Sequence, residues 1–147
     1  MGQELPPKGT VIAPDHALCD ECPRKDSKPD NVAITEFKRP QQILIDEQKC
    51  LLAQGVMCMG PATRAGCEAL CINGNMPCTG CCGPTSRVHD QGAKILSSLA
   101  ILVDAKEDDA ICSIEASIPD PVGSFYRYSL PASFLRKKHS AAVAKSR

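Results

Sequence analysis

The sequence predicts a small domain organised around bound metal, mostly irregular, with a few short α-helices, one longer helix near residues 86–103 and little or no β-sheet. The 147 residues include ten cysteines, and six of them lie with six glycines and three prolines between residues 55 and 84. Only five aromatic residues, and no tryptophan, are available for a core. Aromatic side chains bury the most area per residue, so hydrophobic burial alone contributes little stability here.

Charge and segment composition argue against two classes of partner. Seventeen basic and seventeen acidic residues cancel, whereas a protein that binds nucleic acid through phosphates carries a basic excess. The longest apolar run, residues 95–103, is nine residues long, about half of what a membrane-spanning helix requires. No basic and then apolar leader is visible, so we expect no secretory signal. We therefore expect a cytoplasmic protein, in which clustered cysteines favour metal over disulfides.

The chain is expected to divide into an extended lead-in (1–15), a metal-binding domain (16–135) and a basic tail (136–147). Prolines and a glycine in the lead-in disfavour helix. Within the domain, Pro40 begins a short helical segment. Asp46 is expected to cap another helical segment that ends at Gly55, where glycine allows a left-handed residue.

The longest helix is predicted after Pro84. Thr85 or Ser86 would cap it, and its apolar positions follow the spacing of one helix face. These positions are Val88, Ile95, Leu96, Leu99, Leu102 and Val103. The acidic residues 104–109 are expected to form a connection, and residues 111–123 are expected to contain a loop. Residues 124–139 carry four of the five aromatics and are expected to pack on a partner or on the metal site.

The cysteine spacing indicates two sites of four thiolates each. The tightest group consists of Cys67, Cys71, Cys78 and Cys81, and a second can be drawn from Cys19, Cys22, Cys50 and Cys58. On a helical turn, Cys67 and Cys71 would face the same side. The 55 residues between the two Cys-x-x-Cys motifs far exceed the gap of a zinc ribbon. The spacing fits iron–sulfur clusters or zinc, and glycine-lined loops favour iron–sulfur because their amides can hydrogen-bond to cluster sulfurs.

The segment from Cys50 to Pro84 resembles a known family. Its run CMGPATRAGC, its ending MPCTGCCGP and the earlier stretch ALCDECPR are similar to the small subunit of cytoplasmic nickel–iron hydrogenases. The closest type is the group that includes the methyl-viologen-reducing and deazaflavin-reducing hydrogenases of methanogens. The resemblance covers residues 5–135.

The resemblance implies two 4Fe-4S clusters and their ligands. A medial cluster would be held by Cys67, Cys71, Cys78 and Cys81, and a distal cluster by Cys19, Cys22, Cys50 and Cys58. Many relatives use a histidine at the distal cluster, and His16 has that spacing from Cys19. The cytoplasmic group uses four cysteines there, which favours Cys22.

The resemblance also implies a function and partners. The protein would be a non-catalytic subunit that relays single electrons through the two clusters, between a nickel–iron hydrogenase-type subunit and a second iron–sulfur or flavin subunit. The family's N-terminal flavodoxin-like half is absent from this sequence, so the first partner is either the large subunit or a separate chain carrying that half. A zinc-organised structural adaptor without a redox role is the alternative. No catalytic triad, phosphate loop or His-Glu-x-x-His motif is present.

The remaining candidate residues have simpler interpretations. Cys82 directly follows Cys81, and adjacent residues rarely bind one cluster, so Cys82 is expected not to be a ligand. Cys112 is expected to be a small buried hydrophobic residue. Arg64 either adds positive charge beside a cluster or forms a surface ion pair. An apolar shell that limits water near the clusters is expected from Met57, Met59 and Met76.

Overall fold

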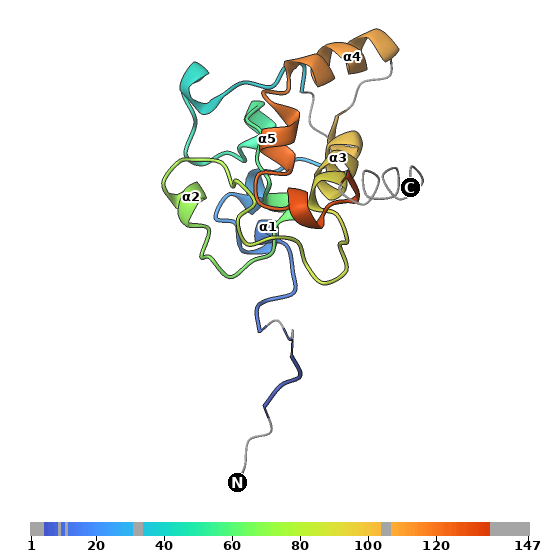
Figure 1. Cartoon of the computed structure of the whole chain (residues 1–147). Helices are drawn as coiled ribbons and strands as arrows, with labels where there is room; N and C mark the ends of the chain where they lie inside the picture. Colours follow the sequence, from blue (N-terminus) through green and yellow to red (C-terminus); the bar gives the residue numbers. More distant parts are fainter. Residues whose placement is uncertain (1–4, 9, 11, 31–33, 104–106, 136–147) are drawn as a thin grey trace, which may run out of the picture.

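Helices and loops alternate along the chain, of which the computed structural model describes residues 5–8, 10, 12–30, 34–103 and 107–135. The α-helices there are α1 (Leu18–Glu21), α2 (Leu70–Asn73), α3 (Gln91–Leu102), α4 (Asp108–Ser117) and α5 (Pro121–Phe125). The 3-10 helices are η1 (Lys25–Ser27), η2 (Pro40–Gln42), η3 (Leu52–Gln54), η4 (Gly60–Ala62) and η5 (Leu130–Ala132). Across these ranges no β-strand forms, which confirms the predicted mostly irregular fold with short helices (Figure 1). None of the described helices is long and apolar enough to span a bilayer.

Helix α3 ends where the sequence predicted and begins five residues later than predicted. The Asp90 side chain caps it by accepting a hydrogen bond from the Ala93 backbone N–H at 2.9 Å. Ser86 is not the cap, because its backbone N–H donates to an Asp15 carboxylate oxygen at 2.7 Å and its hydroxyl bonds the other oxygen. The buried face of α3 carries the apolar residues Ile95, Leu99 and Leu102.

The prediction of a helix after Asp46 is wrong, although the predicted end at Gly55 is correct. Only the 3-10 turn η3 forms within it, and Gly55 ends this turn with a left-handed φ of 75°. The Gln54 side chain explains the difference: its Nε2 donates to the carbonyls of Asp46 and Lys49 at 3.1 and 2.9 Å. These contacts occupy backbone groups that a helix would use.

Helix α4 corrects two expectations. The sequence predicts an acidic connection over residues 104–109, yet Asp108–Ser117 is helical with two aspartates in its first turn. Negative charge there favours the helix N-terminus. Residues 104–106 of the expected connection lie outside the described residues. Cys112 is exposed on α4, so its expected burial is wrong, because the buried face of this helix is at Ile114.

The packing of α1, η4 and α3 positions the cysteines. Helix α3 packs against η4, and η4 packs against α1. The buried Gln91 side chain donates from Nε2 to the Gly80 carbonyl at 3.0 Å, which fastens the Cys-x-x-Cys loop to α3. The Leu18 backbone N–H donates to the Thr63 carbonyl at 2.8 Å and joins α1 to the turn after η4.

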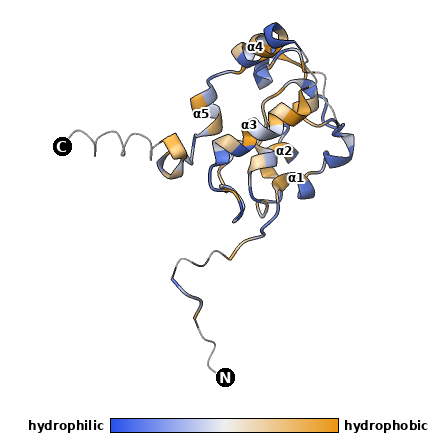
Figure 2. Cartoon of the chain, turned by 90° about the vertical axis from the view of Figure 1, so that its right-hand side faces the viewer, coloured by the Kyte–Doolittle hydropathy of each residue, from blue (hydrophilic) through white to orange (hydrophobic). Residues whose placement is uncertain are grey.

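Residues of α3 and α4 line opposite sides of a small, partly open apolar pocket of about 190 Å³. Both hydrophobic and hydrophilic residues occur along each of these helices (Figure 2). The cavity is lined mainly by Leu96, Leu99, Ile111, Ile114 and Ile118. This amphipathic pairing places α4 over α3.

The aromatic segment after α4 folds back on α3 rather than lying free. Phe125 is buried, and the Phe134 backbone N–H donates to Asp90 Oδ2 at 2.8 Å. Gly92 allows the Tyr126 ring to lie against α3, because a Cβ at Gly92 would lie 2.1 Å from Cζ of that ring. The predicted basic tail, residues 136–147, lies outside the described residues.

Candidate metal centre

All ten cysteines lie in the described ranges and are free thiols. Cys19 lies in α1 and Cys22 caps its end, while Cys50 and Cys58 lie on either side of η3. The Cys19 thiol interacts electrostatically with Cys22 and Cys50, and Cys58 interacts with Cys19. The chain therefore gathers Cys19, Cys22, Cys50 and Cys58, which we call the N-terminal cysteine group.

The second set, Cys67, Cys71, Cys78 and Cys81, forms the C-terminal cysteine group. Cys78 interacts electrostatically with Cys67 and Cys81, so these three lie close together. Cys71 lies in α2 and is exposed. Its carbonyl accepts a hydrogen bond from the Met76 backbone N–H at 2.8 Å, which closes the loop leading to Cys78.

Cys67 and Cys71 do not share a helical turn, contrary to the sequence prediction. Helix α2 begins only at Leu70. Glu68 and Ala69 before it have left-handed φ values of 53° and 52°. Two successive left-handed residues cannot continue a right-handed helix, so Cys67 belongs to the preceding loop.

Backbone and hydroxyl donors point at the buried sulfurs. The backbone N–H of Arg24 donates to Cys22 Sγ at 3.4 Å. Cys58 accepts from the backbone of Gly60, and Cys78 accepts from the Gly80 backbone and the Thr63 side chain. Such donors stabilise the negative thiolate form, which is the form that binds metal.

The two cysteine groups touch at Cys58 and Cys78, which are both buried. The Cys78 backbone N–H donates to Cys58 Sγ at 3.4 Å, and the Met59 backbone N–H donates to the Cys78 carbonyl at 2.9 Å. A member of one group is thus hydrogen-bonded directly to a member of the other.

Burial controls the protonation of two thiols in the N-terminal group. It raises the pKa of both Cys19 and Cys58 to about 12. These thiols therefore hold their protons at neutral pH when no metal is bound, and they are poor nucleophiles. Binding of a metal must displace those protons, which couples metal affinity to pH.

The backbone approaches two of these sulfurs closely at a glycine. Gly60 lies against two of them: a Cβ there would lie 3.2 Å from Cys19 Sγ and 3.6 Å from Cys58 Sγ. In the described part of the chain, no three Cys, His, Asp or Glu side chains converge on one metal-ion position. The four thiolates of a 4Fe-4S cluster bind different iron atoms, so a cluster site does not require such convergence.

Two nearby charged residues are engaged elsewhere. The exposed His16 ring, two residues before α1, pairs through Nε2 with Oε1 of Glu21 at 2.8 Å. Arg64 pairs with Asp15 at 3.6 Å and is only 11% exposed. The ion-pair interpretation of Arg64 is therefore confirmed, although the side chain is mostly buried.

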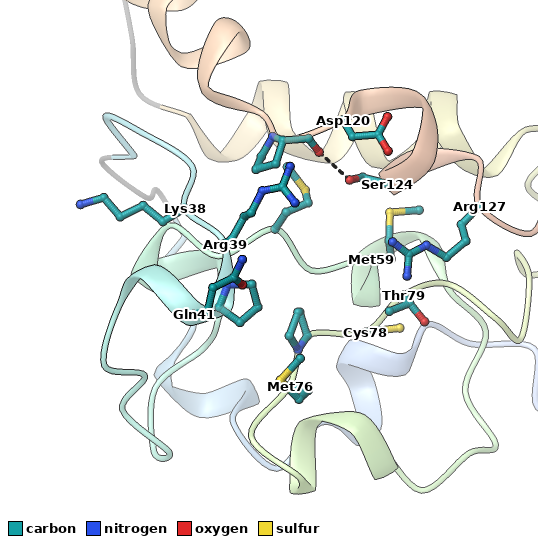
Figure 3. Close-up of a pocket in the computed structure, with 14 residues that line it drawn as sticks. Lys38, Arg39, Gln41, Met59, Met76, Cys78, Thr79, Asp120, Ser124 and Arg127 are labelled. Atoms are coloured by element: carbon teal, nitrogen blue, oxygen red, sulfur yellow. Dashed lines mark hydrogen bonds between the residues drawn. The ribbon is translucent and has the colours of Figure 1, made fainter.

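A cavity of about 300 Å³ adjoins the C-terminal cysteine group (Figure 3). Cys78 lies at the wall of this cavity, and Arg39 and Arg127 reach towards the cavity from opposite sides. The three methionines of the expected apolar shell line it. Met59 is buried as expected, whereas Met76 is 51% exposed.

A fifth thiol beside the C-terminal group was not expected from the sequence. The Cys82 thiol lies within hydrogen-bonding reach of Cys67 and Cys81. The adjacency of Cys81 and Cys82 in the sequence was the feature from which a nearby extra thiol could have been predicted.

Replacing Cys82 with serine is expected to leave the bound iron unchanged, because adjacent residues rarely bind one cluster and the family resemblance assigns the fourth ligand to Cys71. Cys112→Ser, which changes an exposed cysteine on α4, is the matched control. Iron per chain measures the result. A loss of about half of the iron in Cys82→Ser alone would make Cys82 a ligand.

Comparison with known proteins gives consistent relatives. The chain is 40% identical over 131 residues to a subunit of the F420-non-reducing hydrogenase of Methanothermobacter thermautotrophicus, covering 87% of this chain and 42% of that protein. It is 38% identical over 137 residues to the iron-sulfur subunit of the F420-non-reducing hydrogenase of Archaeoglobus profundus, covering 91% and 42%. With the corresponding hydrogenase subunit of Methanothermus fervidus, identity is 41% over 119 residues, covering 79% and 93%. The chain thus spans about two fifths of the first two relatives. No family model matches it.

Proposed function

Because this chain belongs to the family of F420-non-reducing hydrogenase iron-sulfur subunits, we propose that it relays single electrons through two 4Fe-4S clusters in a hydrogenase-type complex. The observation that carries the proposal is the hydrogen bond between the two cysteine groups, from the Cys78 backbone N–H to Cys58 Sγ at 3.4 Å. It supplies a short, buried connection between two candidate sites of four thiolates. A relative named as an iron-sulfur subunit supports the same cofactor class.

The cysteines of the two groups would hold the clusters. The proposed medial ligands are Cys67, Cys71, Cys78 and Cys81, and the proposed distal ligands are Cys19, Cys22, Cys50 and Cys58. Bound 4Fe-4S clusters supply sites that accept and release one electron. The buried Met59 keeps water away from the sulfurs. Backbone amides donate hydrogen bonds to the sulfurs. Cys22 rather than His16 is the fourth distal ligand in this proposal, since His16 is paired with Glu21.

Electrons would enter and leave through partner chains. One is a hydrogenase-type catalytic subunit, or a chain that carries the flavodoxin-like half of the small subunit. The other is a second iron–sulfur or flavin subunit. The C-terminal group reaches the surface at Cys71 and Cys81, which are exposed, and this is where we place one of the two contacts. We also propose that the complex works in the cytoplasm, where reducing conditions keep thiols available.

The test is the metal content of the full chain, purified without oxygen. About eight irons and eight acid-labile sulfides per chain are expected for two 4Fe-4S clusters. Zinc without sulfide would overturn the relay and leave a structural adaptor. About four irons would contradict the two-cluster assignment.

Removal of iron by a chelator is expected to unfold most of the domain. The cysteines come from separated loops, and the helices that carry them have only four residues each, too short to be stable alone. Circular dichroism and hydrogen exchange measure the loss, which should be reversed by reconstitution with iron and sulfide. Native-like protection in the iron-free chain would contradict this expectation.

A further inference from the structure

Arg24 is a charged side chain buried between the two cysteine groups, and it is only 5% exposed. Its Nη2 donates to the Ile72 carbonyl at 3.1 Å and to Asn75 Oδ1 at 2.8 Å. Its Nη1 lies 3.4 Å from the Lys49 carbonyl and 3.5 Å from the Asp46 carbonyl. The guanidinium thus connects the loops that lead to Cys50 and away from Cys71.

The acceptors of the Arg24 guanidinium are neutral carbonyl and amide oxygens. Among the described residues, no carboxylate lies within ion-pair distance of it. The carboxylate of Asp46 pairs with Lys49 instead, and Arg24 is the weakest of the groups that act on it. Burial of an unpaired positive charge is costly. Its retention at this position points to a stronger negative partner than the Asp46 carboxylate.

The position of Arg24 identifies that partner. Its backbone N–H donates to Cys22 Sγ, and its carbonyl accepts from the Ser27 hydroxyl, which in turn accepts from the Cys50 backbone N–H. Lys49 and Ile72, whose carbonyls bind the guanidinium, are the chain neighbours of Cys50 and Cys71. The Cys22 thiolate and the cluster that it would hold are therefore candidates for the missing negative charge, beside the more weakly placed Asp46 carboxylate.

We propose that the Arg24 guanidinium is the buried counter-charge of the thiolate-bound clusters. It raises the reduction potential of the distal cluster more than that of the medial cluster. This inference rests on the proposed function. A 4Fe-4S cluster with four thiolates is negatively charged and becomes more so on reduction. A nearby cation in a low-dielectric interior stabilises the reduced form more than the oxidised form.

The test uses the full chain purified without oxygen, with EPR-monitored redox titration and iron content as readouts. Arg24→Gln removes the positive charge and is expected to lower the reduction potential of the distal cluster. Arg24→Lys keeps the charge, so its distal potential should stay closer to that of the unmodified chain. Arg87→Gln is the matched control, because Arg87 is an exposed arginine that belongs to neither cysteine group. A structural role alone would not separate the glutamine variant from the lysine variant.

A second variant neutralises the charge without removing the arginine. Asn75→Asp places a carboxylate at the 2.8 Å contact with the guanidinium, so it too is expected to lower the potential. Asn73→Asp adds the same charge two residues away, at the exposed last position of α2, and should have a smaller effect.

The outcomes separate the two proposals. Unchanged potentials in Arg24→Gln and Asn75→Asp with about eight irons retained would overturn the role of Arg24 and leave the relay intact. Absence of iron and sulfide from the unmodified chain would overturn the relay itself. If Arg24→Gln loses its iron, the role of Arg24 is tested by the distal reduction potential of Asn75→Asp instead. A distal potential equal to that of Asn73→Asp would overturn the inference.

Discussion

Replacing Cys78 with serine is expected to reduce bound iron from about eight to about four per chain. Cys78 is buried, and its sulfur lies among Cys67 and Cys81. A serine hydroxyl is a poor iron ligand, so the C-terminal group would lose its cluster. The N-terminal group should keep its cluster, because the backbone N–H of residue 78 still donates to Cys58 Sγ.

EPR spectra of the reduced protein measure which signal disappears. Cys58→Ser is the reciprocal variant and should remove the other signal. Retention of all the iron in Cys78→Ser would show that the medial assignment is wrong. Loss of both signals would show that the two groups assemble only together.

Replacing Asp90 with alanine is expected to lower the free energy of unfolding by about 2–4 kcal/mol. The buried carboxylate accepts hydrogen bonds from the backbone N–H groups of Ala93 and Phe134, at 2.9 and 2.8 Å. Alanine would remove the acceptor of both hydrogen bonds, uncap α3 and loosen the attachment of the segment after α5 to α3. Denaturant unfolding of the iron-loaded chain measures the change, with Asp109→Ala in the exposed first turn of α4 as the control. A change below about 0.5 kcal/mol would contradict this role.

The pH dependence of stability tests the same group. Burial is the largest single influence on the pKa of Asp90 and raises it. The hydrogen bonds from Ala93, Phe134, Tyr126 and Gly92 together lower it more, so the net pKa lies below the usual value. The stability from this carboxylate is therefore complete above about pH 4 and is lost as the pH falls below it. Asp90→Asn should remove this part of the acid sensitivity.

The sequence predicted the overall type of fold because cysteine, glycine and proline composition is a property of the whole segment. It also predicted the end of α3, which apolar periodicity defines. The start of α3 could not be predicted, because the choice between Ser86 and Asp90 depends on Asp15, a distant residue that engages Ser86. Helix α4 was missed because its acidic first turn and few apolar residues resemble a polar connection.

The grouping of the cysteines could be predicted from spacing and from the family resemblance, but the detail inside each group could not. The left-handed backbone at Glu68 and Ala69 has no sequence signal, since neither residue favours that region. The approach of Cys82 to Cys67 depends on how two loops meet. The burial of Arg24 likewise depends on carbonyls from two loops that lie more than twenty residues further along the chain.

The hydrogen bonds of Asp15 and Phe134 determine how this domain can be linked to other polypeptides. Asp15 is bound to Ser86 and Phe134 to Asp90, and residues 86 and 90 are at most about 14 Å apart along the chain. Both ends of the described domain therefore meet beside the start of α3. A short linker from residue 135 to residue 12 should therefore cyclise the domain without separating the cysteines of either group. A bulky fusion at one end would also restrict the space available at the other.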